Sequence, residues 1–319
     1  MIYRAENAEL VQGSSSINNQ PFGFLNINKP SGCTSHDVVA KLRKITGIKK
    51  IGHCGTLDPL ANGVLVVGIN QATRLFEYLS EDKIYLAKIT LGLSTNTDDI
   101  TGEVINKSDK IPSLSEIMNI LNLFKGKITQ KPPIFSALKI KGKRSYKLAR
   151  DGKISLDEIK ERIVEIYSTS VIDYSNGVLE LRVHCSSGTY IRSIARDLGK
   201  HLNTYAVLSA LTRLNIGNCF FLENSLSLDL IKPETYHQHL IEPQDVINLP
   251  KIVIEAKHVI DLLKGKFVKN ASFIQKINTP FKKNTELQIL DNNNTLIAIG
   301  NLEEGCIIKP KKVLVQDEK

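Results

Sequence analysis

The chain has 319 residues, which is long enough for one large domain plus a small one, or for two ordinary domains, each with its own core. Hydrophobic residues make up 42% and charged residues 24%, as in ordinary globular proteins, and no apolar run approaches the roughly 18 residues that span a bilayer, which argues against a membrane protein. The formal net charge of +9 favours anionic partners, such as nucleic acid or a membrane surface, over acidic proteins.

The positive charge is concentrated in one basic segment, residues 125–153. It holds ten lysines and arginines against a single acid, Asp151, so it accounts for the whole formal net charge of +9. Phe135 and Tyr146 lie among these basic residues. A solvated basic face is the alternative interpretation of such a run, but contact with phosphate groups is favoured.

The cysteine pattern indicates a reducing compartment. The five cysteines are an odd number without Cys-x-x-Cys spacing: Cys33, Cys54, Cys185, Cys219 and Cys306. This argues against a disulfide framework and a zinc ribbon, and fits the cytoplasm. Residues 1–20 lack the apolar core of a signal peptide, and we expect them to form a disordered extension.

The first half of the chain alternates strands and helices. A strand at 22–28 enters a turn at Lys29–Gly32, and a helix follows from an N-cap at Thr34 or Ser35 to about Gly47. The pattern then predicts a loop at 52–63, a strand at 64–69, a short helix at 72–79, a strand at 83–91 and a helix at 114–124.

The second half predicts a hairpin, a helix and a small C-terminal module. Strands at 163–174 and 178–185 flank the favoured turn pair Asn176-Gly177, and a helix at 190–202 and a strand at 207–216 follow. An irregular stretch with Pro233, Pro243 and Pro250 indicates a domain boundary. Beyond it we expect a helix at 257–264 and strands at 287–290, 295–299 and 305–308.

These elements predict an α+β fold. We expect a large domain at 21–245, with a mixed, largely antiparallel sheet flanked by helices, because the order of elements has no regular βαβ repeat. A small β-rich domain at 246–319 completes the chain.

The segment from Gly52 to Gly63, Gly-His-Cys-Gly-Thr-Leu-Asp-Pro-Leu-Ala-Asn-Gly, is the most informative in the chain. Its glycines and its Asp58-Pro59 pair constrain the backbone, as in loops that present binding and catalytic groups. Taken alone, an aspartate before a proline is more often a turn residue than a catalyst. The other motifs of the chain favour a catalytic role for Asp58.

Several further motifs follow in order along the chain: Leu25–Gly32, Ala72–Arg74, Thr97–Asp99 with Gly102, Pro132-Pro133 with Ser136–Lys139, Ser187–Arg192, and Leu211–Arg213. With Gly52–Gly63, they resemble the TruB family of tRNA pseudouridine synthases, and the resemblance runs almost continuously from Phe22 to about Ile216. The C-terminal module is similar to the small PUA-type RNA-binding domain of that family, mainly by its position and by Leu262–Gly265.

The resemblance implies isomerisation of uridine to pseudouridine at position 55 in the T-loop of tRNA. The bond from N1 to C1′ breaks, the uracil turns, and the ring rejoins the sugar through C5. This chemistry needs no cofactor and no metal. The sequence likewise contains no dinucleotide-binding fingerprint after a strand, no Walker A motif and no deaminase zinc signature.

The resemblance also implies the catalytic residues. Asp58 matches the catalytic aspartate, which attacks the nucleotide or stabilises the cation formed on cleavage. Burial disfavours a charged carboxylate, so an opposite charge must lie close to it, and Arg192 matches the arginine that pairs with it. Tyr85 matches the tyrosine that stacks on the target uracil, which must first be flipped out of the RNA loop.

Other positions match the substrate pocket. His53 occupies space near the vacated base, Tyr190 bonds near the base, and Leu211 lines the pocket. Lys29 supports the loop or contacts phosphate, and Arg213 is a candidate second phosphate contact. The candidate contacts to the RNA backbone are Lys139, Lys141, Lys143 and Arg144, whereas Thr97–Asp99 read as turn structure.

The expected partner is the T-stem and loop of tRNA, with no membrane, no obligatory protein partner and a monomeric enzyme in the cytoplasm. Two alternatives stay open. The protein could be a tRNA-binding chaperone whose chemistry is dispensable, or it could resemble the guide-RNA-dependent relatives of the family. The segment from Pro132 to Gly152 and the short C-terminal module resemble the bacterial type, which favours the stand-alone enzyme.

Overall fold

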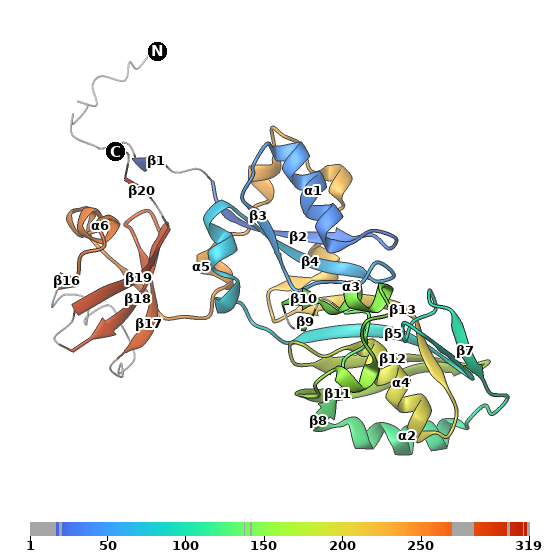
Figure 1. Ribbon diagram of the computed structural model, residues 1–319. Coiled ribbons are helices and arrows are strands. Elements are labelled where there is room, and N and C mark those ends of the chain that lie inside the picture. Colours follow the sequence, from blue (N-terminus) through green and yellow to red (C-terminus); the bar gives the residue numbers. More distant parts are fainter. Residues whose placement is uncertain are drawn as a thin grey trace, which may run out of the picture. The chain divides into compact units, whose positions relative to one another are not determined.

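The computed structural model describes residues 17–18, 21–136, 138–140, 142–269, 284–304, 307–314 and 316–317 (Figure 1). The chain forms two compact units. The large unit comprises the described residues of Phe24–Ile69 and Leu79–Ile241. The small unit combines Asn70–Tyr78 with the described residues from Glu242 onward and with those up to Gly23.

The large unit is built on a nine-stranded sheet with the strand order β2-β4-β13-β5-β12-β11-β8, in which β3 also pairs with β4 and β14 with β13. The strands are β2 (Gly23–Lys29), β3 (Ile51–Cys54), β4 (Asn62–Ile69), β5 (Lys83–Leu91), β8 (Gly126–Gln130), β11 (Arg162–Ser175), β12 (Val178–Cys185), β13 (Ala206–Ile216) and β14 (Phe220–Phe221). β13 pairs with β4 in parallel, and the pairs from β13 through β5, β12 and β11 to β8 are antiparallel. The predicted mixed, largely antiparallel sheet flanked by helices is confirmed.

Helices cover this sheet in two groups. α2 (Leu114–Leu121) and α4 (Ile191–His201) lie on the same face, where their apolar side chains join those of β5, β11, β12 and β13 in one core (Figure 1). α1 (Ser35–Thr46) packs on β2, β3 and β4 in a second core. The remaining helix of the large unit, α3 (Ser145–Arg150), lies in the basic segment.

Local signals in the sequence set the ends of α1 and of the long hairpin. The Thr34 side chain accepts a hydrogen bond from Asp37 N, the Asp37 carboxylate accepts one from Thr34 N, and Gly47 ends the helix with a left-handed φ of 73°. Between β11 and β12, Asn176 and Gly177 take φ values of 51° and 73°, as a two-residue turn requires.

The small unit contains a five-stranded sheet in the order β15-β17-β18-β19-β16, with α5 (Pro243–Val246) and α6 (Ala256–Leu263). Its strands are β15 (Lys251–Val253), β16 (Val268–Lys269), β17 (Thr285–Leu290), β18 (Leu296–Glu303) and β19 (Ile307–Val313). The core is formed by aliphatic side chains of the strands and α6. The β-rich character predicted for the C-terminal part is therefore confirmed.

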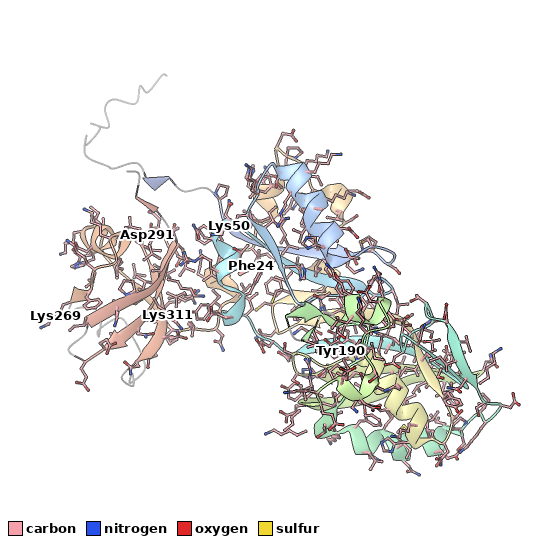
Figure 2. All side chains as sticks on the ribbon, in the orientation of Figure 1. Phe24, Lys50, Tyr190, Lys269, Asp291 and Lys311 are labelled. Carbon is pink, nitrogen blue, oxygen red and sulfur yellow. The ribbon has the colours of Figure 1, made fainter. Side chains whose placement is uncertain are left out.

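The small unit also includes Asn70–Tyr78, from the middle of the sequence. This segment forms two 3₁₀ turns, Asn70–Arg74 and Phe76–Tyr78, where the sequence predicted one helix at 72–79. Arg74 Nη1 donates to the carbonyl of Val313 at 2.6 Å, and Lys312 Nζ donates to the carbonyl of Arg74 at 2.7 Å. Lys312 and its neighbour Lys311 (Figure 2) also lie over the ring of Tyr78.

Other differences from the prediction are local. Gly52–Cys54 belong to β3 and Asn62–Gly63 to β4, so the predicted loop shortens to residues 55–61, the Asp58 loop. Three short hairpin or strand pairs were not predicted: β1 (Ile17–Asn18) with β20 (Gln316–Asp317), β6 (Leu93–Thr95) with β7 (Val104–Lys107), and β9 (Lys139–Ile140) with β10 (Lys143–Arg144). Apart from Ile17–Asn18, the extension predicted before Pro21 lies outside the described residues.

Cys33, Cys54 and Cys185 are free thiols, and Cys306 lies outside the described residues. In the part of the chain that the structure describes, no helix is both long enough and apolar enough to cross a membrane.

Candidate active site

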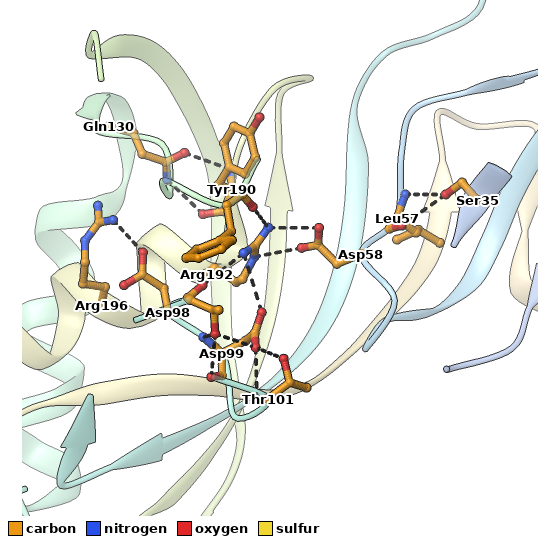
Figure 3. A network of polar contacts seen from close by, with 12 residues as sticks. Ser35, Leu57, Asp58, Asp98, Asp99, Thr101, Gln130, Tyr190, Arg192 and Arg196 are labelled. Atoms are coloured by element: carbon orange, nitrogen blue, oxygen red, sulfur yellow. Dashed lines mark hydrogen bonds and ion pairs between the residues drawn. The ribbon is translucent and has the colours of Figure 1, made fainter. Parts of the chain in front are cut away.

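The Asp58 loop is anchored to the turn before α1 and to the start of that helix. Leu57 N donates to Ser35 Oγ at 2.8 Å, and Ser35 Oγ donates to the carbonyl of Leu57 at 3.1 Å (Figure 3). Ser31 Oγ donates to the carbonyl of Leu60, and Gly32 N to that of Pro59, both at 2.8 Å. These bonds fix the backbone on both sides of Asp58.

Two buried cations brace the same region. Lys29, with 0% exposure, donates from Nζ to the carbonyls of Pro30 and Cys33 at 2.9 and 2.7 Å. Burial lowers the pKa of this ammonium, and the nearby Cys33 and Asp58 oppose that shift. Arg213, 1% exposed, donates from Nε to the carbonyl of Val64 at 2.7 Å and from Nη2 to that of Gly55 at 3.1 Å.

The burial of Lys29 and Arg213 limits what these two cations can bind. A guanidinium or ammonium that is enclosed and bonded to backbone carbonyls has few donors left for phosphate. For Lys29 and Arg213 the geometry therefore favours support of the Asp58 loop over contact with RNA phosphates.

Arg192 holds Asp58 through two contacts. Arg192 Nη2 donates to Asp58 Oδ1 at 2.9 Å, and Arg192 Nε lies 2.9 Å from Asp58 Oδ2 (Figure 3). The arginine side chain is 4% exposed, whereas that of Asp58 is 32% exposed. A fork-shaped guanidinium thus fixes both oxygens of a carboxylate that stays accessible on one side.

Further acceptors fix the guanidinium itself. Arg192 Nη1 donates to the carbonyl of Thr97 at 3.0 Å and lies 3.6 Å from Asp99 Oδ2, and Nη2 also donates to the carbonyl of Phe135 at 2.9 Å. The Asp99 carboxylate is buried and accepts bonds from Thr97 Oγ1, Thr101 N and Thr101 Oγ1. A second, hydrogen-bonded anion therefore lies behind the arginine.

The turn around Asp98 is held by a neighbouring ion pair. Asp98 takes a left-handed φ of 61°, and its Oδ2 lies 2.8 Å from Arg196 Nη1, one helical turn beyond Arg192. Burial raises the pKa of Asp98, and the Arg196 charge opposes that shift. Sequence reasoning read Thr97–Asp99 only as turn structure and so missed its contact with Arg192. Two adjacent acids beside a motif glycine are the signal that could have indicated it.

Tyr85, Leu211 and the apolar residues of the Asp58 loop share one core cluster. Leu57, Ala61, Tyr85 and Leu211 are all buried in it. Tyr85 on β5 lies opposite Arg213 on β13 and is 7% exposed. Burial raises the pKa of its phenol, Arg213 opposes that shift, and the nearby Asp58 charge reinforces it.

Tyr190 and His53 lie on two other elements. Tyr190 is the N-cap residue of α4, two residues before Arg192, and its backbone is bonded to the buried Gln130. His53 lies on β3 opposite Val67, just before the Asp58 loop, and is partly buried. Gln130 is a further residue that sequence reasoning did not single out.

The entry to the basic segment is tied to α4. The carbonyl of Lys131 accepts hydrogen bonds from Ser193 Oγ at 2.9 Å and from Arg196 Nη2 at 2.7 Å, in addition to the bond from Arg192 to Phe135. Farther along, Lys143 pairs with Ile140 and Arg144 with Lys139 in the β9–β10 hairpin. Lys141 lies outside the described residues.

The site combines the anchored carboxylate of Asp58 with Tyr85 and with apolar side chains such as Leu211. Such a carboxylate can act on an electron-poor carbon while the apolar side chains exclude water from a flat, uncharged ring. No group of three or more His, Cys, Asp or Glu side chains that could hold a metal ion occurs among the described residues.

Solved structures share this fold. One, entitled "Structure of H/ACA RNP bound to a substrate RNA containing 2'-deoxyuridine", matches with a TM-score of 0.66 and 24% identity over 92% of this chain and 84% of that one. Another, "Crystal Structure of a Cbf5-Nop10-Gar1 Complex", matches with a TM-score of 0.63 and 27% identity over 94% of this chain and 84% of that one. The chain therefore has the pseudouridine synthase fold.

Comparisons of the sequence are more specific. A family model described as "TruB family pseudouridylate synthase (N terminal domain)" matches residues 43–191. tRNA pseudouridine synthase B of Prochlorococcus marinus is 41% identical over 320 residues, covering 94% of this chain and 100% of that protein. The protein of the same name from Thermosipho melanesiensis is 40% identical over 305 residues, covering 91% and 98%. The chain belongs to the TruB family of pseudouridylate synthases.

Proposed function

We propose that this enzyme converts uridine 55 in the T-loop of tRNA to pseudouridine, with Asp58 as the catalytic carboxylate. The observation that carries the proposal is the pairing of both Asp58 oxygens with Arg192, which leaves one third of the carboxylate side chain accessible. The names of the relatives that match nearly the whole chain support tRNA as the substrate.

The reaction is an isomerisation that balances without a co-reactant. The N1–C1′ bond breaks, the uracil turns, a C5–C1′ bond forms, C5 loses its proton, and N1 gains one. Asp58 either attacks the nucleotide or stabilises the cation formed on cleavage. In both routes it must be ionised and fixed in place, and the guanidinium of Arg192 supplies the charge and the geometry for this.

The neighbouring residues receive the flipped base. Tyr85 stacks on the uracil, Leu211 lines the apolar wall, Tyr190 bonds near the base, and His53 fills space near the position the base leaves. Flipping costs a few kcal/mol, which stacking in the pocket offsets. Because burial raises the pKa of the Tyr85 phenol, that ring is neutral at physiological pH, as a stacking platform requires.

The basic segment, residues 125–153, supplies contacts to the phosphates of the T-stem and loop. Lys139, Lys141, Lys143 and Arg144 are the proposed contact residues. The enzyme works in the cytoplasm as a monomer, without a cofactor, an obligatory protein partner or a membrane. The close relatives named as tRNA enzymes favour this over a guide-dependent mode.

The test is tritium release from a tRNA transcript labelled at uridine C5, with the product mapped by chemical-adduct primer extension. The proposal expects release that is lost when uridine 55 alone is replaced by cytidine. Release that persists in that transcript would assign the activity to another position. Tight binding without release would instead favour the chaperone or guide-dependent alternative.

A further inference from the structure

The backbone of Tyr190 is held from outside its own helix. Gln130, 1% exposed at the end of β8, accepts a hydrogen bond from Tyr190 N at 2.8 Å and donates one to the carbonyl of Tyr190 at 3.1 Å (Figure 3). Tyr190 is the N-cap of α4, yet its own side chain makes no capping bond. Gln130 therefore fixes where α4 begins, and with it the base of the Tyr190 side chain.

A second contact holds the ring. Arg162 lies directly opposite Gln130 in the β8–β11 pairing, and its guanidinium carbon is 5.2 Å from the centroid of the Tyr190 ring. Arg162 Nη1 also lies 3.5 Å from the carbonyl of Gly188, two residues before Tyr190. Among the described residues, these are the two contacts of the Arg162 side chain, and neither is with a carboxylate.

These contacts suggest what the guanidinium does. A planar cation over a phenol ring is attracted to its face, and it disfavours the other rotamers of that ring. Gln130 fixes the backbone of Tyr190 but leaves the ring free to turn about two side-chain bonds. The contact with the Arg162 guanidinium therefore favours one orientation of the ring.

We propose that Arg162 is a positioning residue, which acts on the reaction by orienting the ring of Tyr190 toward the flipped base. This inference rests on the proposed role of Tyr190 in the base pocket. Arg162 does not touch the reacting atoms in this account, so its removal slows the isomerisation only while an aromatic ring is present at position 190.

The test is a double-mutant cycle on the single-turnover rate of pseudouridine formation. Arg162→Ala is compared with the parent in three backgrounds: wild type, Tyr190→Phe and Tyr190→Leu. We expect a loss of about tenfold in wild type and in Tyr190→Phe, and no further loss in Tyr190→Leu, where the ring is absent. Arg162→Lys, which keeps the cation but not the flat surface, should recover part of the rate.

A phosphate contact or a general effect on folding would give a different pattern. In either case Arg162→Ala would slow all three backgrounds alike, which would overturn the inference, as would an unchanged rate in wild type. If Tyr190→Leu kept the full wild-type rate, Tyr190 would have no role in the base pocket. That result would also overturn the inference about Arg162.

Binding is measured separately, with each variant placed in an Asp58→Asn background so that no turnover occurs. The affinity for unmodified tRNA should change no more than for the matched control Arg182→Ala, an exposed arginine on β12. A selective loss of affinity in Arg162→Ala would assign the residue to phosphate contact instead.

Discussion

At the scale of single residues, the site is a chain of alternating charges. Asp58 pairs with Arg192, and Arg192 in turn lies 3.6 Å from the buried Asp99. The Asp99 carboxylate accepts hydrogen bonds from Thr97 and Thr101, which fix its position beside the guanidinium. The result is an arginine whose orientation is fixed before substrate arrives.

The fork of Arg192 is therefore expected to matter beyond its charge. Arg192→Lys keeps one positive charge but cannot contact both Asp58 oxygens, Thr97 and Phe135 together. We expect the single-turnover rate to fall about 10²-fold while the affinity for tRNA changes little. Single-turnover kinetics with filter binding checks this, and a fully active lysine variant would show that charge alone suffices.

Tyr85 leads to a prediction about pH. Its pKa is raised above the ordinary value near 10 by burial, so the phenol stays protonated to higher pH than a free tyrosine. The single-turnover rate should show no alkaline decline caused by Tyr85 below about pH 10. A decline in that range that is present in wild type and absent in Tyr85→Phe would contradict this protonation state.

At the scale of elements, the Asp58 loop depends on a close approach between β4 and β13. A Cβ added at Gly63 would lie 2.3 Å from the carbonyl oxygen of Arg213 and 2.8 Å from its nitrogen, so Gly63→Ala must push the two strands apart. Gly47→Ala is a matched control, because Gly47 also has a positive φ but has no atom within 4 Å of an added Cβ.

Gly47→Ala should cost about 1–2 kcal/mol, as a left-handed alanine does. Gly63→Ala should cost about 1–3 kcal/mol more and should also lower activity, because it shifts the end of the Asp58 loop. Urea unfolding and single-turnover rates measure the two effects. Equal stability losses in the two variants would mean that the strands can separate there without cost.

Elements with local signals could be predicted from the sequence. The capping box at Thr34 and Asp37, the Asn176-Gly177 turn and the alternation of β5 each depend on neighbours within a few positions, and each is present in the structure. The segment 70–78 was misjudged because its 3₁₀ turns contact Lys312 and Val313, far away in the sequence.

The site residues, too, could be predicted only where a local motif marks them. The motif containing Asp58 and the motif containing Arg192 could be identified from the residues, and the structure places the two side chains in contact. Gln130 and Arg162 carry no local sign of their contacts with Tyr190, because each contact crosses from a strand to the start of α4. Arg213 was a candidate second phosphate contact from the sequence, because its burial on β13 cannot be read from a short motif.

At the scale of the whole molecule, the basic segment accounts for the net charge and should dominate the affinity for RNA. Neutralising Lys141, Lys143 and Arg144 together should weaken tRNA binding and reduce the salt slope by up to about three phosphate contacts. Binding isotherms at several salt concentrations test this. An unchanged slope would remove these three residues from the RNA interface.

We propose that Asp58, held by Arg192, is the carboxylate on which the isomerisation of uridine in tRNA depends. The most direct measurement compares tritium release from C5-labelled tRNA by wild type, Asp58→Asn and the exposed control Asp109→Asn. We expect full release by wild type and by Asp109→Asn, and no release by Asp58→Asn. The affinity of Asp58→Asn for tRNA should stay within about tenfold of wild type. Substantial release by Asp58→Asn would contradict the proposal.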